Sequence, residues 1–244
     1  MRTVRAVFLL VYYIFLLILG APFVLFCLAF KISAPLFVVA NWVMRVSRAV
    51  LGIKVEVSGF ERFDSGAAYV FMANHESFLD GPLLFVLIPR RVRAIIKKSA
   101  FAIPVLGWIM IAAGFIPVDR RAGGGGVRSI ERAVRAMKEK GHSFLIFPEG
   151  TRSLDGRLAR FRRGGFFLAV GAGAPIVPVT IRGTFELMPK GRFGAKKGTV
   201  HVEFHDPIPV EGYAVGDMDG LVAKVRDAIG GQALTFDTRP NVRT

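Results

Sequence analysis

The chain has 244 residues, of which 52% are hydrophobic and 21% are charged, and its 33 basic and 18 acidic residues give a formal net charge of +15. Soluble domains average roughly 45–50% apolar and about 25% charged residues, so this chain is too apolar to be disordered and too basic for an ordinary soluble enzyme. Its length suits one domain with a short appendage, which excludes a large multidomain assembly. The single cysteine, Cys27, excludes a disulfide framework and a cysteine-based metal site, and we expect it to pack among apolar side chains.

The first predicted element is an apolar segment that runs from residue 6 to residue 30 without a charge, and a second apolar stretch follows at 32–44. At about 1.5 Å per helical residue, the first stretch can cross a hydrocarbon core of ~30 Å. It is also longer than the apolar region of a signal peptide, which is about 7–15 residues. Residues 1–50 are therefore predicted to be a membrane-associated helical segment.

Two arrangements of this segment fit the pattern. One is a single spanning helix, in which proline is tolerated. The other is a helical hairpin that breaks at the Gly-Ala-Pro sequence 20–22, because glycine and proline disfavour the interior of a helix. Basic residues flank the segment on both sides, with Arg2 and Arg5 before it and Arg45 and Arg48 after it. Since basic flanks favour the cytoplasmic side, we favour the hairpin, with both of its ends in the cytoplasm.

From residue 51 onward, short apolar runs alternate with amphipathic stretches. We expect strands at 54–57, 68–73, 93–96, 114–118, 143–147, 176–181 and 199–204, and helices at 83–87, 105–112, 127–139, 165–170 and 218–229. Strands separated by helices indicate an α/β sheet with helices on both faces. We therefore predict an α/β domain at 51–230 and a polar C-terminal tail at 231–244.

The first candidate site is the sequence NHESFLD at 74–80, which follows a predicted strand. On a regular helix His75 and Asp80 would lie about 140° apart, so they meet only if His75 lies in the loop and Asp80 begins the helix. In that arrangement a neutral imidazole can take a proton from a hydroxyl, while the aspartate fixes its tautomer. The alternative is that Asp80 merely caps the helix.

The second candidate site is the sequence FPEGTRS at 147–153, which also follows a predicted strand. It places an acid, exposed backbone amides and Arg152 in one tight loop. An arginine guanidinium is a planar fork that matches the geometry of a phosphate. Further basic clusters along the chain indicate an anionic lipid, a phosphate-bearing substrate, an acidic protein or nucleic acid as partner. The apolar membrane segment before the domain makes nucleic acid the weaker option.

Four sequence blocks occur in a fixed order: NHESFLD at 74–80, GFIPVDR at 114–120, FPEGTRS at 147–153 and IVPVTIRG at 176–183. This ordered set resembles the glycerolipid acyltransferases, a family that includes 1-acyl-sn-glycerol-3-phosphate acyltransferase. The resemblance covers about residues 51–207 and the N-terminal apolar segment. It implies a mixed sheet with flanking helices, the glycerolipid acyltransferase fold, preceded by a membrane-embedded helical hairpin.

The resemblance also implies roles for individual residues. His75 and Asp80 would form a catalytic dyad, and Pro178 would belong to a block near the acyl-binding region. The residues implied to bind the phosphate and glycerol are Lys97, Lys98, Arg120, Glu149, Gly150, Thr151 and Arg152. No cofactor or metal is implied; His201 and His205 lie in a predicted strand and lack the helical H-E-x-x-H arrangement.

The implied reaction transfers an acyl chain from acyl-CoA or acyl carrier protein to the free sn-2 hydroxyl of 1-acyl-glycerol-3-phosphate, giving phosphatidic acid for phospholipid biosynthesis. Its partners would be membrane phospholipids, the lysophospholipid acceptor and the acyl donor, with no nucleic acid, at the cytoplasmic face of a membrane (the plasma or inner membrane in a bacterium). Three alternatives stay open. The acceptor could be another lyso-lipid, such as a lyso-ornithine lipid, or glycerol 3-phosphate; the chain could hydrolyse the thioester; or it could be a non-catalytic membrane-anchored protein that binds anionic lipids.

Overall fold

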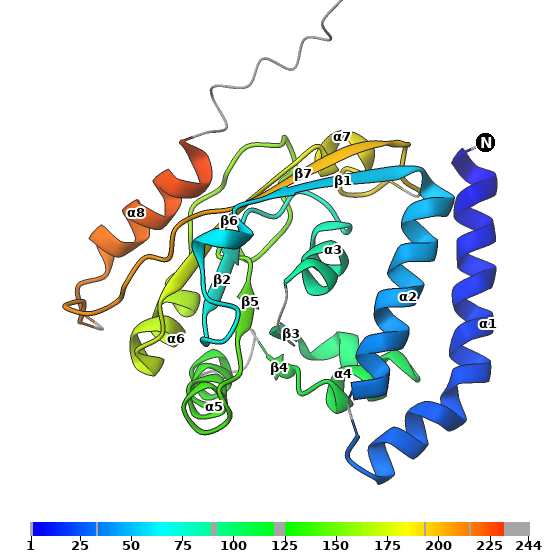
Figure 1. Ribbon diagram of the computed structural model, residues 1–244, viewed down its shortest axis with the longest axis horizontal. Helices are drawn as coiled ribbons and strands as arrows, with labels where there is room; N and C mark the ends of the chain where they lie inside the picture. The colour runs from blue at the N-terminus through cyan, green and yellow to red at the C-terminus, as the bar shows by residue number, and fades with distance from the viewer. Residues whose placement is uncertain are drawn as a thin grey trace, which may run out of the picture.

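Figure 1 shows the computed structural model, which describes residues 2–32, 34–88, 92–119, 125–192, 194–214 and 216–231. The predicted tail at 231–244 therefore lies outside the described residues, apart from Gly231. The division of the chain into segments 1–50, 51–230 and 231–244 stays a prediction.

One mixed sheet organises the described part of the domain. Its seven strands are β1 (Ile53–Ser58), β2 (Val70–Ala73), β3 (Arg93–Lys97), β4 (Ile116–Val118), β5 (Phe144–Ile146), β6 (Ile176–Arg182) and β7 (Gly198–Phe204). They lie in the order β1-β7-β6-β2-β5-β3-β4. Neighbouring strands are parallel except β6 and β7, which are antiparallel. Each predicted strand is found, with bounds shifted by at most a few residues, and the predicted mixed α/β architecture is confirmed.

Helices cover both faces of this sheet (Figure 1). They are α3 (Asp80–Leu87), α4 (Leu106–Ala112), α5 (Gly125–Lys140), α6 (Gly164–Ala172), α7 (Thr184–Leu187) and α8 (Asp219–Gly230), with short 3₁₀ helices η1 (Phe60–Arg62) and η2 (Lys98–Ala102). Alternate residues of a strand point to opposite faces. In β2, Phe71 packs in the core beneath α3, whereas Val70 and Met72 pack in the core beneath α5, α6 and α8. The apolar side chains of one strand thus hold both helix layers.

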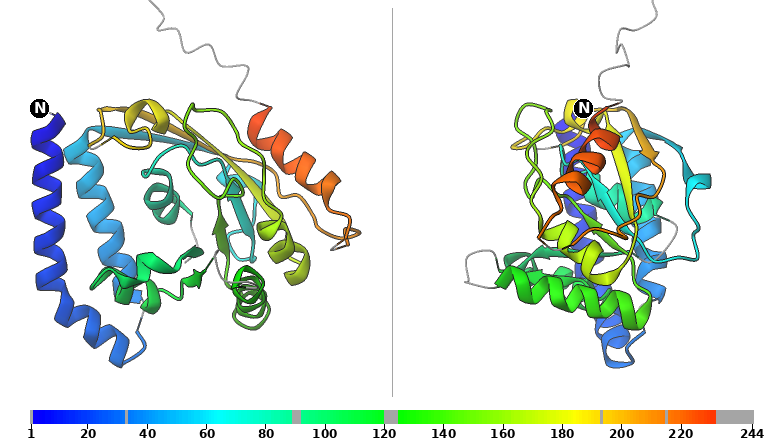
Figure 2. Two further views of the ribbon diagram at one scale, coloured as in Figure 1. Left: turned by 180° about the vertical axis from the view of Figure 1, so that it is seen from behind. Right: turned by 90° about the vertical axis from the view of Figure 1, so that its left-hand side faces the viewer.

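The N-terminal segment forms a pair of helices, α1 (Arg2–Ala29) and α2 (Ala34–Leu51). The hairpin is present, but the predicted break at 20–22 is wrong: α1 continues through Pro22, and the chain turns after Ala29. Figures 1 and 2 show α1 changing direction in its C-terminal part. Proline removes one helical hydrogen bond and bends a helix without ending it when the apolar surroundings favour helix on both sides.

The two helices are attached to each other and to the domain. The Tyr13 hydroxyl donates to Ser47 Oγ at 2.7 Å, which joins α1 to α2. Leu9 of α1 and Leu51 of α2 belong to the core beneath α3. Cys27 is 2% exposed and packs in a small apolar cluster with Leu36, so the packing role expected for it is confirmed.

The outer surface of the hairpin stays apolar and exposed. The helical stretches 3–29 and 34–51 are long and apolar enough to cross a membrane, with mean hydropathies of 2.6 and 1.3. In each stretch only 11% of an apolar 18-residue part is buried. A core helix of a soluble protein would be mostly buried. The outward-facing apolar side chains, for example Phe15, Ile18 and Val38 with 57%, 67% and 69% exposure, therefore suggest membrane association.

Candidate active site

Two loops that are far apart in sequence meet at one edge of the sheet. One follows β2 and begins at Asn74, and the other follows β5 and begins at Phe147. β2 and β5 are parallel neighbours with Val70 opposite Phe144, so their carboxyl ends lie side by side. Ligands usually bind at this edge of an α/β sheet. Both predicted candidate sites thus belong to one place in the fold.

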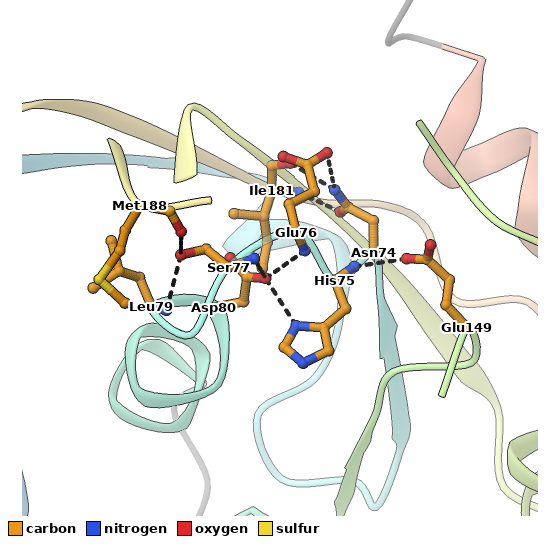
Figure 3. A network of polar contacts seen from close by, with 9 residues as sticks. All are labelled: Asn74, His75, Glu76, Ser77, Leu79, Asp80, Glu149, Ile181 and Met188. Carbon is orange, nitrogen blue, oxygen red and sulfur yellow. Dashed lines mark hydrogen bonds and ion pairs between the residues drawn. The ribbon is translucent and has the colours of Figure 1, made fainter. Parts of the chain in front are cut away.

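His75 and Asp80 contact each other across the first loop. His75 Nδ1 lies 2.9 Å from Asp80 Oδ2, and Figure 3 shows the two side chains turned toward one another. As expected, His75 lies in the loop and Asp80 is the first residue of α3. Asp80 is fully buried, whereas 20% of the His75 side chain is exposed. The imidazole is therefore held from the protein side and is accessible to solvent.

Asp80 orients the imidazole rather than capping the helix. Its Oδ2 also accepts the backbone N–H groups of Glu76 and Ser77, both at 2.7 Å, and these residues precede α3. Because this oxygen accepts hydrogen bonds from every partner, Nδ1 of His75 acts as a donor to it. In the neutral ring the lone pair is then on Nε2, which points away from the network in Figure 3. An Nε2 lone pair is what a general base needs.

The second loop fastens His75 from three sides. The His75 backbone N–H donates to Glu149 Oε1 at 2.7 Å, and its carbonyl accepts the Ser153 N–H at 2.7 Å. The Phe147 ring stacks on the imidazole with a centroid separation of 4.0 Å and an interplanar angle of 19°. Neither its backbone nor its ring can therefore shift without breaking contacts to the loop after β5.

The Glu149 carboxylate faces backbone groups, and the contact with the glycerol phosphate that the family resemblance implies stays a prediction. Its second oxygen accepts the Ala159 N–H at 2.9 Å, and the residue is only 3% exposed. Burial raises the pKa of Glu149, while the N–H groups of Ala159 and His75 act in the opposite direction. This geometry is that of a residue that positions the histidine loop.

Asn74 ties the start of the first loop to β6. Its Oδ1 accepts the Ile181 N–H and its Nδ2 donates to the Ile181 carbonyl, both at 2.8 Å. The same Nδ2 donates to Glu76 Oε1 at 3.0 Å.

Burial, followed by the negative charge of Asp80, raises the pKa of Glu76 from 4.5 to about 8. This pKa favours the protonated form of Glu76 at neutral pH, which lowers the negative charge beside Asp80.

The residues expected to bind phosphate lie at this edge or outside the described residues. Arg120 belongs to the part of the chain that the structure does not describe. Lys97 ends β3 and Lys98 begins η2, and both are exposed. β3 is parallel to β5, so these lysines leave the sheet at the same edge as His75. Arg152 is half-buried in the loop after β5.

Gly150 and Thr151 shape the same loop. Gly150 has a φ of +72°, and a Cβ at this position would lie 2.9 Å from Arg162 Cδ and Nε, so only glycine fits the turn without strain. Lys190 Nζ lies 3.4 Å from Thr151 Oγ1. Lys190 thus adds a cation to the loop, and no sequence signal places it there because the two residues are 39 positions apart.

The remaining residues considered in the sequence lie in the sheet or, for His205, directly after β7. Pro178 is buried within β6 opposite Met72, and its expected relation to the acyl-binding region stays a prediction. His201 of β7 lies 3.0 Å from Glu56, whereas His205 Nε2 lies 2.7 Å from Thr180 Oγ1. The two imidazoles thus have different partners on the two sides of β7.

Comparison with known proteins gives matches along most of the chain. The family model described as Acyltransferase matches residues 54–182. A chloroplastic 1-acyl-sn-glycerol-3-phosphate acyltransferase of Brassica napus is 37% identical over 80% of this chain and 56% of its own length. The corresponding Arabidopsis thaliana protein is 36% identical over 80% of this chain and 54% of its own length. This chain therefore spans about half the length of these relatives.

Two further matches extend the comparison. The human 1-acyl-sn-glycerol-3-phosphate acyltransferase alpha is 31% identical over 73% of this chain and 63% of its own length. The crystal structure of the 1-acyl-sn-glycerophosphate acyltransferase PlsC from Thermotoga maritima superimposes with a TM-score of 0.78 at 26% identity. That match covers 98% of this chain and 100% of the other, so it includes the helical hairpin as well as the sheet.

Proposed function

The chain belongs to the acyltransferase family, among the 1-acyl-sn-glycerol-3-phosphate acyltransferases, and on this premise we propose that it acylates the sn-2 hydroxyl of 1-acyl-glycerol-3-phosphate. The acyl chain comes from the thioester of acyl-CoA or acyl carrier protein, and the product is phosphatidic acid. The observation that carries the proposal is the His75–Asp80 pair with its accessible Nε2. Binding alone would not need a buried aspartate behind a histidine.

In the proposed reaction His75 Nε2 takes the proton of the sn-2 hydroxyl as its oxygen attacks the thioester carbon. The C–O bond forms, the C–S bond breaks, and the imidazolium returns the proton to the leaving thiolate. Asp80 stabilises the imidazolium through Nδ1 and keeps the ring oriented. A positioned acid–base group contributes about 10²–10⁴-fold to the rate. The step uses these residues and two substrates, without a metal or cofactor.

The phosphate of the acceptor is proposed to lie against the basic residues at the same edge of the sheet. Arg152 and Lys190 approach from the loops after β5 and α7, and Lys97 and Lys98 from the end of β3. Arg120 is proposed as a further partner on the strength of the sequence block alone. Cations placed on both sides of a phosphate fix the position of the neighbouring glycerol hydroxyl relative to His75.

The helical hairpin is proposed to hold the enzyme on the cytoplasmic face of a membrane. The acceptor and the product are lipids, whereas thioester donors are soluble molecules of the cytoplasm. An active site at the membrane interface can reach both the lipid substrates and the soluble donor. The exposed apolar surface of α1 and α2 and the basic residues Arg5, Arg45 and Arg48 at their domain end support this arrangement.

The alternatives differ in what they need for turnover. A thioester hydrolase would release product without an added lysolipid, and a lipid-binding protein would show no turnover. An enzyme for lyso-ornithine lipid would not need a phosphate on its acceptor. An assay of the purified protein with a panel of lysolipids, offering both acyl-CoA and acyl carrier protein as donors, separates these cases.

The dyad is tested by His75→Ala and Asp80→Asn, assayed for acyl transfer in membranes. We expect a loss of at least about 10²-fold in kcat for each variant. The control is His201→Ala, which removes an exposed imidazole that contacts Glu56 on the outer part of the sheet and should leave turnover unchanged. Near-normal turnover of either dyad variant, with the control also active, would reject the dyad.

A further inference from the structure

An exposed apolar surface lies outside the hairpin, on α4 and the turn that precedes it. Ile103, Leu106, Trp108 and Ile111 are 46%, 39%, 36% and 57% exposed. Large apolar side chains gathered in this way on a protein surface indicate a partner or a membrane. The proposed acyl transfer makes no use of them.

This surface lies beside the turn of the hairpin. Val105, Ile109 and Ala112 pack against the apolar cluster of Val24, Cys27 and Leu36, so one face of α4 is attached to α1 and α2 while the other is exposed. Figures 1 and 2 show α4 and α5 at the same end of the molecule as the turn between α1 and α2. A bilayer that receives the hairpin turn would therefore also face α4 and α5.

A groove of about 480 Å³ runs between η2–α4 and α5 along the edge strand β4. Its apolar lining includes Phe101, Ile111 and Phe115, and its basic lining includes Lys98, Arg132 and Lys140. Among the residues described by the structure, no carboxylate lines the groove. Ile111 belongs to both the groove and the exposed apolar surface, so the two features are continuous.

We call the exposed apolar surface of α4 and the adjoining groove beside α5 the α4–α5 surface. We propose that this surface is a second membrane contact and that its groove binds an anionic phospholipid. The headgroup phosphate would lie among Lys98, Arg132 and Lys140, with an acyl chain along Phe101, Ile111 and Phe115. Interfacial membrane contacts combine apolar side chains with basic residues in this way, because the apolar groups enter the acyl boundary while the cations attract anionic lipid. The proposal extends the membrane attachment of the hairpin. The groove shares Lys98 with the proposed acceptor-phosphate site, so the test uses Arg132 and Lys140, which have no part in the proposed acyl transfer.

A lipid fits this surface better than an acidic protein. The exposed side chains of α4 continue the apolar surface of the hairpin, which already matches hydrocarbon. A soluble acidic partner would satisfy the cations, but it would have to cover an apolar surface that extends onto α1 and α2. Binding of a protein here is therefore an outcome that the experiment must separate.

The chain contains two tryptophans, Trp42 on α2 and Trp108 on α4, which makes a direct test possible. In Trp42→Phe the only indole is Trp108, and in Trp108→Phe it is Trp42. Each full-length variant is reconstituted into phosphatidylcholine vesicles with 30% phosphatidylglycerol, in which lipids brominated near the headgroup end of the chains quench indole fluorescence on contact. We expect quenching of both tryptophans.

The result that overturns the second contact is quenching of Trp42 without quenching of Trp108. If neither tryptophan is quenched, the second contact and the hairpin attachment both fail. Acyl transfer is not the readout, so either result leaves the His75–Asp80 proposal to its own test.

The lipid site is tested with two kinds of vesicle, in which either phosphatidylglycerol or phosphatidylcholine carries the bromine. At equal total bromine, we expect Trp108 to be quenched more strongly when phosphatidylglycerol carries it, because each basic residue enriches anionic lipid roughly five-fold. When Arg132→Gln and Lys140→Gln are added to Trp42→Phe, brominated phosphatidylglycerol and brominated phosphatidylcholine should quench Trp108 about equally. The matched control, Arg135→Gln with Lys138→Gln, removes the same charge from α5 outside the groove and should keep the preference.

Two outcomes would overturn the lipid site. One is equal quenching by the two brominated lipids in the protein with an intact groove. The other is loss of the preference in the control pair as well, which would mean that general charge rather than the groove selects the lipid. If lipid preference is absent and acidic carrier protein binds in a manner that depends on Arg132 and Lys140, the surface is a protein-docking site instead.

Discussion

The backbone N–H of His75 donates to Glu149 Oε1 at 2.7 Å, so the proposed base after β2 is fastened to the loop after β5. The other oxygen of the same carboxylate accepts the Ala159 N–H. One buried side chain thus joins the loop after β2, 74 residues away in sequence, to a second point of its own loop, 10 residues away. The proposed reaction needs an imidazole at a fixed place, and we propose that Glu149 helps to hold it there through the backbone of His75.

We expect Glu149→Gln to lower kcat roughly ten-fold and to leave the KM for the acceptor nearly unchanged. The glutamine carbonyl can still accept from His75, but its amide group opposes the Ala159 N–H, and a buried donor left without an acceptor costs about 1–3 kcal/mol. Glu149→Ala leaves both N–H groups unpaired and should be worse. Steady-state kinetics on membranes or detergent-solubilised protein provide the measurement.

The comparison with Glu211→Gln controls for loss of an exposed carboxylate elsewhere. If Glu149→Gln raises KM and spares kcat, the carboxylate contacts the acceptor, as the sequence block implied, and the positioning role is wrong.

Asn74 provides a second prediction, because an amide is the side-chain group that can both accept from and donate to the backbone of Ile181. Asn74→Asp keeps the acceptor and loses the donor, whereas Asn74→Ala loses both. We expect the alanine variant to lose about 1–3 kcal/mol of stability, a fall in Tm of roughly 3–10 °C, with the aspartate variant in between. Thermal unfolding followed by circular dichroism tests this order, and an unchanged Tm for Asn74→Asp would contradict it.

The sequence was sufficient to predict the strands and the pair of loops but not the contacts between them. The apolar runs that became β2 and β5 are visible in the sequence, and parallel strands bring the loops after them to one edge. The partners of Glu149 are backbone N–H groups, which leave no trace in residue type, so only the structure shows this contact, while the substrate contact implied by the family resemblance stays a prediction. Lys190 is one of several lysines in its region, and only the path of the chain after α7 brings it to Thr151.

The turn of the hairpin was misplaced for a different reason. Gly20 and Pro22 disfavour helix locally, but the part of α1 on both sides of Pro22 carries no charged side chain. Its residues before and after Pro22 pack against α2 and α4, including Cys27 in the cluster with Leu36. Tertiary packing therefore overrode the local preference, and the proline changed the direction of the helix instead of ending it.

The next prediction concerns the phosphate of the acceptor. We expect Arg152→Ala to raise the KM for the acceptor about ten-fold and Lys190→Ala to raise it about three-fold. The effect of Arg152 is larger because a planar guanidinium makes stronger charge-assisted hydrogen bonds to phosphate than an exposed ammonium does. Lys196→Ala is the matched control, since it removes an exposed lysine of the same loop region. Kinetics with an acceptor that lacks the phosphate should show no difference among the variants. An unchanged KM for the phosphorylated acceptor removes the substituted residue from the phosphate site.

The final prediction concerns Glu76, whose pKa is raised from 4.5 to about 8 by burial and by the charge of Asp80. Between these pH values the folded protein holds a proton that the unfolded chain has released. Stability should therefore fall as the pH rises through this window, by at most about 1.4 kcal/mol per pH unit from this group, and the contribution of Glu76 should level off above pH 8.

Glu76→Gln keeps the carbonyl that accepts from Asn74 and cannot ionise, so we expect it to be no less stable than the parent at pH 5 and more stable at pH 9. Thermal unfolding in detergent from pH 5 to pH 9 measures the difference between the two curves. Glu61→Gln removes an exposed carboxylate and should run parallel to the parent. If the stability of Glu76→Gln changes with pH in parallel with that of the parent, Glu76 is ionised over the whole range. The proposal that a protonated Glu76 reduces the negative charge beside Asp80 would then be wrong.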